Sequence, residues 1–330
     1  MSFFTFLKNK SLFYVVILLM TFSFCEDPIE PDPVEWPSRY EKIPADAVKM
    51  TPETDNFPPV LHSEEWNEPV PMEGPVNTAG AEDAPVITPD GLTFFLFFTP
   101  DVDIPPESQL LDSVTGIWWT EKSGGEWSEP ERILLNDDLA LDGPFCIVAD
   151  TLWFGSFRVG NYGEDGDIYT TIYDGEKWTN WQNAGERINS QYNVGELYLP
   201  INAREMIFHR AGFGGYGEYD LWKSEKVGDE WIEPVNLGPT VNSELNDSHP
   251  FISSDGTELW FTGVSKKSYP GPALFRSVKS DTGWSVPDEI ISSFAGDPGL
   301  DEQGNIYFTH HFFSSEMKMI EADIYVAYKK

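Results

Sequence analysis

The feature that most constrains the fold is a Trp-x-x-Pro motif that recurs along most of the chain. It begins at Trp66, Trp127, Trp231 and Trp284, and Trp178 stands in the remaining slot without its proline. Successive tryptophans are 61, 51, 53 and 53 residues apart. Periods of roughly 40 to 50 residues built from short strands are typical of radial β arrays. The spacing therefore indicates five copies of one structural unit.

Each copy carries a second pattern in the same phase. An acidic residue precedes a short apolar run, a turn such as Ser254-Asp255-Gly256 follows, and the next run ends in an aromatic residue. Asp and Gly tolerate the positive φ of a tight turn, so each copy contains a hairpin signal. We therefore predict an all-β fold, a five-bladed β-propeller of four-stranded antiparallel blades.

Both ends of the repeat region are incomplete. No inner hairpin precedes Trp66, and the last copy stops after its third strand at residues 323–328. An N-terminal strand near Trp66 that completes the last blade, begun by residues 297–308, would close the ring without an open sheet edge. We predict that residues 57–330 form the propeller in this way.

The first 25 residues have the pattern of an export signal. Lys8 and Lys10 precede an apolar run at 12–24, which is shorter than the roughly 20 residues that span a bilayer. A cysteine that closes such a run, here Cys25, resembles the lipidated cysteine of bacterial lipoproteins, although Phe24 stands where a small residue is usual. The alternatives are an uncleaved anchor or a simple secretory signal. The resemblance implies a cell-envelope protein, lipid-anchored in the outer membrane on its periplasmic side or at the cell surface.

Residues 26–56 are predicted to be a tether and lead-in. Residues 26–37 are acidic and rich in proline, which favours an extended chain. A short helix is expected near residues 45–50, ended by Pro52.

Charge and cysteine content narrow the classes of partner. The chain has 55 acidic and 21 basic residues, a formal net charge of -34, which disfavours binding to nucleic acids. Once Cys25 is acylated, Cys146 has no partner for a disulfide, and its apolar surroundings predict a packing role.

The acids of the repeats are candidate site residues. Each precedes the inner strand of its copy, so in a propeller they would converge at one mouth of the central channel: Asp83, Asp142, Glu196, Asp247 and Asp297. Crowded carboxylates repel one another, which raises some pKa values or recruits a divalent cation. Apart from that cation we expect no cofactor. The alternative is that each acid only holds backbone donors at the start of its strand.

The third copy resembles the WD40-like propeller repeats of TolB-type envelope proteins. The resemblance lies in residues 207–222, with a glycine-rich loop before Asp220-Leu221-Trp222, and residues 154–169 repeat it. It implies a scaffold for protein or ligand contacts, with Arg158, His209 and Arg210 as candidate binding residues. Third strands are expected at residues 117–120, 167–169, 220–222, 273–275 and 323–325, and the alternative role for the Asp that begins three of them is to cap the preceding loop.

A second resemblance, around residues 83–96, is to the five-bladed family-43-type glycoside hydrolases. It implies that Asp83 acts as general base, Asp142 as pKa modulator and Glu196 as general acid in an inverting reaction. The sequence departs from that family because no proline directly follows Asp83 and because Leu197-Tyr198 follows Glu196.

Histidines and off-repeat tryptophans complete the candidates. His209 and the pair His310-His311 could face one another and bind a metal or a sugar acid, but no metal-ligand spacing such as His-x3-His is present, so exposed or packed histidines are the alternative. Trp118, Trp119 and Trp181 fall outside the repeat and could form a stacking platform.

The sequence thus predicts an envelope-anchored binding or scaffold module for a protein or carbohydrate ligand, with a glycoside hydrolase as the alternative.

Overall fold

The computed structural model of the chain describes residues 36–135, 140–163 and 166–330. The chain divides into two units, Met1–Glu35 and Trp36–Lys330, and every described element belongs to the second. Among the described residues, no helix has the length and apolar character needed to cross a bilayer. Cys25, the predicted lipidation site, lies outside the described residues.

Antiparallel strands dominate the fold and fall into groups that follow one another along the chain, each named after its first strand. The β3 group contains β3 (Ala81–Ile87), β4 (Thr93–Thr99), β5 (Gly116–Ser123), β6 (Glu126–Trp127) and β7 (Glu131–Arg132). The β8 group contains β8 (Leu141–Val148), β9 (Thr151–Phe157), β10 (Asp167–Tyr173) and β11 (Trp178–Asn183). The β12 group contains β12 (Leu197–Tyr198), β13 (Glu205–Ala211), β14 (Tyr219–Val227), β15 (Glu230–Trp231) and β16 (Val235–Asn236).

The last two groups each include a strand from the beginning of the described chain. The β17 group contains β17 (Ser248–Ile252), β18 (Glu258–Val264), β19 (Pro272–Ser280), β20 (Gly283–Trp284), β21 (Asp288–Ser292) and β1 (Val60–Leu61). The β22 group contains β22 (Ala295–Leu300), β23 (Ile306–Phe313), β24 (Met319–Ala327) and β2 (Val70–Pro71). A parallel bridge between Ala322 and Ala81 joins this group to the β3 group in one nine-stranded sheet.

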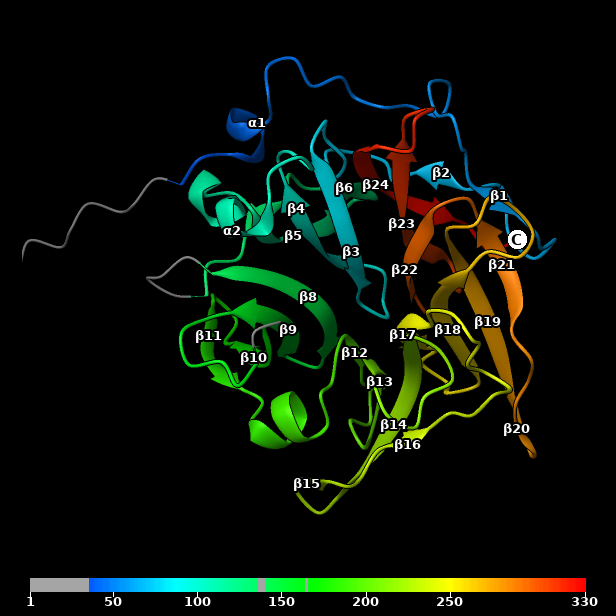
Figure 1. The fold of residues 1–330 in the computed structure, drawn as a ribbon. Coiled ribbons are helices and arrows are strands. Elements are labelled where there is room, and N and C mark those ends of the chain that lie inside the picture. The colour runs from blue at the N-terminus through cyan, green and yellow to red at the C-terminus, as the bar shows by residue number, and fades with distance from the viewer. Residues whose placement is uncertain (1–35, 136–139, 164–165) are drawn as a thin grey trace, which may run out of the picture. The chain divides into compact units, whose positions relative to one another are not determined.

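The pairing of β2 with β24 brings the two ends of the repeat region into one sheet. Val70 lies opposite Val326, and Trp66 forms an isolated antiparallel bridge with Lys329. In Figure 1 the first strands of the groups lie around a common centre, and the later strands of each group lie farther out.

The apolar core is divided into clusters that lie between neighbouring groups. Strands that pack face to face bury both surfaces, which suits the wide aromatic side chains of this sequence. Each cluster joins two groups, as shown by the pairs Phe95 with Phe154, Cys146 with Phe208, Ile207 with Phe261, Trp260 with Phe308, and Phe94 with Ile324.

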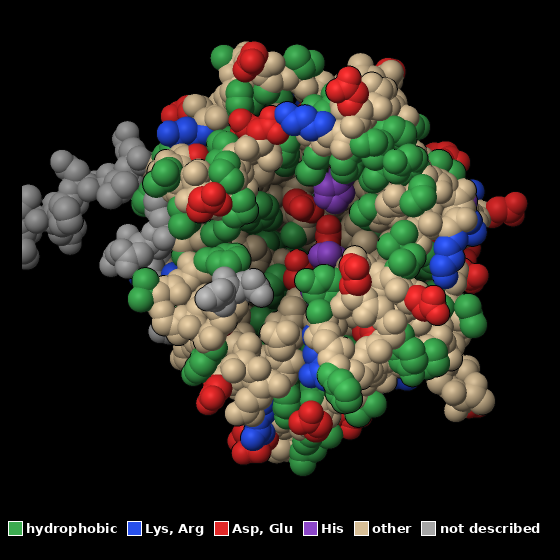
Figure 2. All heavy atoms as spheres, viewed as in Figure 1, with side chains coloured by type: hydrophobic (Ala, Val, Ile, Leu, Met, Phe, Trp, Pro, Cys, Tyr) green, Lys and Arg blue, Asp and Glu red, His purple; other side chains and the backbone are tan. Residues whose placement is uncertain are grey.

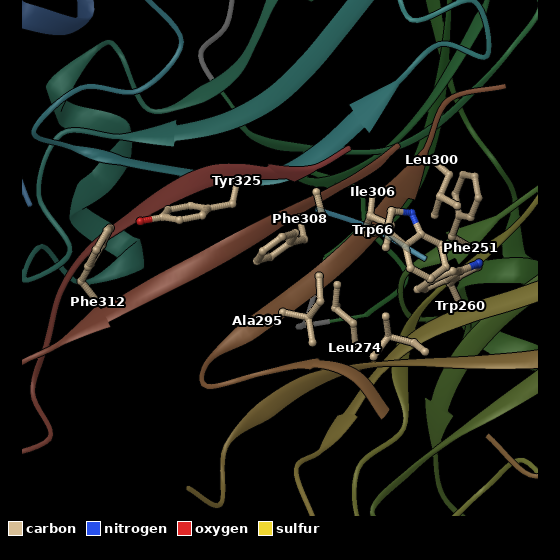
Figure 3. Close-up of a cluster of buried hydrophobic side chains, with 13 residues drawn as sticks. Trp66, Phe251, Trp260, Leu274, Ala295, Leu300, Ile306, Phe308, Phe312 and Tyr325 are labelled. Atoms are coloured by element: carbon tan, nitrogen blue, oxygen red, sulfur yellow. The ribbon is translucent and has the colours of Figure 1, made fainter. Parts of the chain in front are cut away.

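Trp66 fills the junction between the β17 and β22 groups. Its side chain is 1% exposed and packs edge-on against Trp260, with ring centroids 5.6 Å apart. Its indole N–H donates to the carbonyl oxygen of Gly304 at 2.8 Å. Figure 3 shows Trp66 beside Trp260, Ile306 and Phe251. The first Trp-x-x-Pro motif is therefore anchored against the last group of strands.

Buried polar contacts hold the segment before β1 to the β3 and β22 groups. Arg39, in the one-turn helix α1 (Arg39–Lys42), is buried and pairs with Glu82 at 3.2 Å. Lys49 pairs with Glu321 and Asp323 of β24. The prediction of a helix at 45–50 is wrong, because the backbone N–H of Met50 donates to Glu321, at 2.9 Å, instead of to a carbonyl four residues earlier.

The remaining helical turns lie in connections. The long loop between β4 and β5 contains α2 (Pro106–Gln109) and the 3-10 turn η1 (Leu110–Asp112). A π-helical turn, η2 (Arg187–Gln191), links the β8 and β12 groups.

Candidate functional site

Acidic and histidine side chains gather at the centre of one face of the Trp36–Lys330 unit. Figure 2 shows a hollow there, with Asp or Glu and His side chains inside it. Their mutual contacts define an acid–histidine cluster made of Asp83, Glu196, His249, Asp297 and His311. The members come from β3, the residue before β12, β17, β22 and β23, so segments more than 200 residues apart in sequence meet here.

Strand register explains why three of these residues meet. Glu196, His249 and Asp297 each lie two residues before a strand residue that pairs with the second strand of its group. Those pairs are Tyr198 with Ile207, Phe251 with Trp260, and Gly299 with Tyr307. The three residues therefore occupy equivalent positions in successive groups.

Local irregularities in the strands turn two of these side chains, those of His249 and Asp297, toward the centre. His249 and Asp297 have φ values of 49° and 56°, and both sit where the register of the first strand shifts. Positive φ is uncommon for residues other than glycine, and a β-bulge redirects a side chain next to a site. Each of the two residues is followed by a proline, which fixes the chain after the irregularity.

His249 bridges two carboxylates. Its Nε2 lies 3.1 Å from Oε2 of Glu196 and 3.2 Å from Oδ1 of Asp297, and its Nδ1 contacts the hydroxyl of Ser248 at 2.8 Å. Burial alone would lower the pKa of His249, but the charges of Asp297 and Glu196 raise it to about 10. His249 is therefore an imidazolium at neutral pH. In turn, burial would raise the pKa of Glu196, yet His249 holds it below its ordinary value.

Asp83 is held as a carboxylate. It accepts hydrogen bonds from the hydroxyl of Thr309 at 2.7 Å and from the backbone N–H of Ala84 at 2.8 Å. Burial would raise its pKa, but the hydrogen bond and charge of His311, together with these donors, hold the pKa well below its ordinary value. The pKa of His311 is raised in return, because the effect of Asp83 exceeds that of burial.

Asp297 is the member of the cluster that can exchange a proton near neutral pH. Burial raises its pKa to about 7; the charges of Asp83 and Glu196 act in the same direction, and His249 offsets them only in part. The cluster thus combines ionised carboxylates with one carboxyl group that can carry a proton.

Three members could also hold a metal ion. One ligand atom from each of Glu196, His249 and Asp297 lies within 4.8 Å of the others. Carboxylate oxygens and an imidazole nitrogen are a common ligand set for Zn²⁺, and the Ser248 hydroxyl would support the imidazole from its other nitrogen. Such an ion would have to displace the proton of His249, which makes its binding dependent on pH.

A cavity of about 510 Å³ opens beside the cluster, between the β8 and β12 groups. Its volume falls within the ~300–1,000 Å³ of typical small-molecule sites. Glu196 forms part of its wall together with aromatic and polar side chains, among them Phe97, Phe145, Phe157, Tyr219, His209 and Arg210. The cavity and the acid–histidine cluster therefore share Glu196.

Asp142 and Asp247, the other two predicted acids, are engaged elsewhere. Both oxygens of Asp142 accept from Arg158, at 2.9 and 3.0 Å, and burial raises the pKa of Asp142. Asp247 accepts from the backbone N–H of Ser243 at 2.6 Å, and burial raises its pKa to about 6. Asp247 lies two residues before His249, which occupies the equivalent position in its group.

Two of the aspartates expected at the start of third strands, Asp167 and Asp220, fix loops, whereas the third, Asp323, pairs with Lys49. Asp167 accepts from the backbone N–H of Tyr162 at 3.0 Å, and Asp220 accepts from that of Gly217 at 3.0 Å. Each also accepts from an asparagine side chain of the following segment, Asn183 and Asn236 respectively. These contacts match the alternative role that the sequence offered, capping the preceding loop.

The remaining candidates are divided between the cavity and the core. His209 and Arg210 line the cavity, and burial together with the charge of His249 lowers the pKa of His209 to about 4. His310 is buried away from the cluster and contacts Asp55 at 2.8 Å. Trp118 is buried, with 5% of its side chain exposed, and Trp119 packs on Phe95. Trp181 is 36% exposed and lies beside Arg158.

His249 was not among the residues singled out from the sequence. The signal that could have found it is the dipeptide His249-Pro250, which matches Asp297-Pro298 in the next copy. Aligning the copies on acidic residues selected Asp247 instead, two positions away.

The chain was compared with known families, curated proteins and solved structures, and several solved structures match it. No family model matches the chain, and no curated protein matches it. Matching structures include an endo-arabinase from Bacteroides thetaiotaomicron, with 14% identity, a TM-score of 0.48, and coverage of 78% of this chain and 97% of that chain. The α-L-arabinofuranosidase PaAbf62A from Podospora anserina has 12% identity and a TM-score of 0.46, covering 79% and 95%.

TolB from Acinetobacter baumannii also matches, with 12% identity and a TM-score of 0.42 over 77% of this chain and 56% of that chain. The matching structures include TolB proteins and, with a GH43_12 structure retrieved from a capybara gut metagenome, a family-43 protein, which are the two kinds of protein that the sequence resembles. At these values the matches do not bear on activity.

Proposed function

We propose that this protein is an envelope-anchored binding or scaffold module whose protein or carbohydrate ligand enters the cavity beside the acid–histidine cluster. The observation that carries the proposal is the cavity of about 510 Å³, in which aromatic side chains adjoin the partly exposed carboxylate of Glu196. Concave, mostly apolar sites with a few convergent polar groups are the usual form of ligand sites.

The proposal includes a five-bladed ring closed by β2. Two observations support it. First, the core clusters link each group of strands to the next, including the β22 group to the β3 group. Second, one narrow cavity of about 50 Å³ is lined from every group: Pro85, Phe145, Tyr198, Pro250 and Pro298. A central channel of this kind explains why residues distant in sequence converge.

The protonation state of the carboxyl groups favours binding over the inverting hydrolysis that the family-43 resemblance implies. A general acid must carry a proton that it can donate, and His249 holds Glu196 ionised. Asp142, the suggested pKa modulator, is occupied by Arg158 and does not contact the cluster through any described contact. The three residues implied by the hydrolase resemblance therefore do not act as one unit in this arrangement.

A glycoside hydrolase remains the second candidate function, and one observation favours it. Asp297, with a pKa of about 7, and Asp83, with a lowered pKa, pair a protonated with an ionised carboxyl in the same cluster. Carboxyl groups whose pKa values are pushed apart can serve as acid and base. Chromogenic arabinosides, xylosides and glucosides, assayed with wild type, Glu196→Gln and Asp297→Asn, test this. Turnover by wild type that is abolished in Asp297→Asn would support the hydrolase function. Absence of turnover by wild type would exclude it.

Ligand binding is tested on an oligosaccharide array followed by calorimetry. Tyr219 lines the cavity and is 43% exposed, so Tyr219→Ala should weaken binding roughly tenfold by removing its ring contact. Tyr328→Ala is the matched control, since Tyr328 is similarly exposed, at 39%, near the C-terminus and does not line the cavity. Equal affinity of Tyr219→Ala and wild type would exclude this cavity as the site.

The envelope anchor is a separate part of the proposal. It depends on Cys25 and on the preceding apolar run, as argued from the sequence. Labelling cells with a fatty-acid analogue should mark the wild-type protein and not Cys25→Ser. Retention of label in Cys25→Ser would refute lipidation at this residue.

A further inference from the structure

Arg210 lines the cavity without a carboxylate to neutralise it. Among the described residues, Arg39, Arg158, Arg187 and Arg276 each form an ion pair with Asp or Glu. Arg132, Arg204 and Arg210 form none, and of these three only Arg210 lines the cavity. We propose that Arg210 binds the carboxylate of a hexuronic acid unit in an acidic oligosaccharide. This inference rests on the proposed function, because it names the class of ligand that the cavity takes.

The guanidinium of Arg210 is fixed in place before any ligand arrives. It lies over the ring of Trp222, 3.7 Å from the centroid, and Nη1 donates to the carbonyl oxygen of Tyr192 at 3.0 Å. A guanidinium has five N–H donors, so most remain for a ligand. Stacking on an aromatic ring keeps the planar group in one orientation, which suits bidentate binding of a carboxylate.

Arg210 is partly withdrawn from water without a compensating anion. Burial lowers its pKa, and the charge of Glu233 offsets this only in part. An incoming carboxylate would supply the missing charge. The contrast with Arg158 is direct, because that side chain stacks on Trp181 in a similar way but is already neutralised by Asp142.

The other walls of the cavity fit a sugar ring. Phe157 and Tyr219 are 49% and 43% exposed and can cover the apolar face of a pyranose. Glu196 can accept hydrogen bonds from hydroxyl groups, and His209, neutral because burial lowers its pKa to about 4, can donate or accept. Aromatic faces, hydroxyl partners and one cation together match a uronic acid better than a neutral sugar.

Calorimetry with matched sugars tests the inference on the full-length protein. The probes are D-glucuronate and D-galacturonate, each compared with D-glucose and D-galactose. Wild type should bind at least one uronate about tenfold more tightly than its neutral counterpart, the range expected for a hydrogen bond to a charged group. Arg210→Gln should abolish that difference, so that the uronate and its neutral counterpart bind with similar affinity. If Arg210→Gln does not fold, Arg210→Lys should still reduce the preference severalfold, because Lys lacks the planar fork.

Arg204→Gln is the control. Arg204 is exposed in the turn before β13, at the opposite end of that strand from Arg210, so the variant removes one positive charge without touching the cavity. It should keep the uronate preference. Equal binding of uronate and neutral sugar by wild type, or an unchanged preference in Arg210→Gln, overturns the inference while leaving the proposed function intact. If none of the four sugars binds, the inference fails, and the array with Tyr219→Ala decides the proposed function separately.

Discussion

The imidazole Nε2 of His249 lies 3.1 Å from Oε2 of Glu196, although the two residues belong to different groups of strands. The contact links the protonation state of His249, in the β17 group, to the charge of Glu196, in the β12 group. It also makes the centre of the face sensitive to pH, because Asp297 lies 3.2 Å from the same nitrogen.

We expect His249 to stabilise the fold at neutral pH and to lose that effect in alkali. Its pKa is about 10, against an ordinary value of 6.5, so its contribution is complete below about pH 6.5 and is lost as the pH rises through 10. The stability difference between wild type and His249→Gln, from urea unfolding, should shrink by about 1–3 kcal/mol between pH 7 and pH 10, allowing for solvent screening. His62→Gln is the control, because the pKa of His62 is lowered. A difference independent of pH would contradict the ion pairs of His249.

Asp297 should make the free energy of unfolding depend on pH between about pH 4 and pH 7. Its pKa of about 7 lies above the ordinary 3.8, so its stabilising contribution is present below about pH 4 and is lost as the pH rises to 7. Asp297→Asn should therefore flatten the pH dependence of unfolding between pH 4 and pH 7. Asp255→Asn is the control. It removes an exposed carboxylate whose pKa is lowered, so it should leave the pH dependence between pH 4 and pH 7 unchanged. NMR titration of the Asp297 carboxyl carbon would check the pKa directly.

Trp66→Ala should destabilise the protein by about 3–5 kcal/mol, the usual cost of removing a fully buried large aromatic side chain. The variant loses both the contact with Trp260 and the hydrogen bond to Gly304. Trp284→Ala is the matched control, since Trp284 opens the same repeat motif but is only partly buried. Chemical denaturation of both variants measures the difference, and equal losses would argue against Trp66 as an anchor of the N-terminal segment.

Arg39→Met should cost about 3–5 kcal/mol, because it leaves Glu82 as an unpaired buried acid. Burial already raises the pKa of Glu82 to about 7 despite the opposing charge of Arg39. The double variant Arg39→Met, Glu82→Gln should recover part of the loss. Arg187→Met, which breaks an exposed pair with Glu230, should change the unfolding free energy much less. Failure of the double variant to recover stability would show that the contacts of Arg39 with the carbonyls of Pro75 and Val76 dominate.

Much of the strand layout could be predicted from the sequence. The third strands expected at 117–120, 167–169, 220–222, 273–275 and 323–325 fall within β5, β10, β14, β19 and β24. Trp-x-x-Pro spacing and turn residues are local signals, and local signals suffice to place hairpins. The segment near Trp66 was also expected beside the last copy, where β2 pairs with β24.

The composition of the candidate site could be predicted only in part. Asp83, Glu196 and Asp297 were named from the repeat, but His249 was not, because the copies had been aligned on acidic residues. A shift of two residues within a bulged strand decides whether Asp247 or His249 reaches the centre. A search for acids cannot detect that shift.

The sequence by itself determined the repeated hairpins, the acidic surface and the apolar residues that each sheet buries, because periodicity and composition are properties of neighbours along the chain. Only the tertiary structure decided which charges meet. His249 lies between Glu196 and Asp297, and Asp142 is bound by Arg158, because backbone irregularities and contacts between distant strands set the direction of each side chain. Those directions depend on the packing of one sheet against another, which no local pattern specifies.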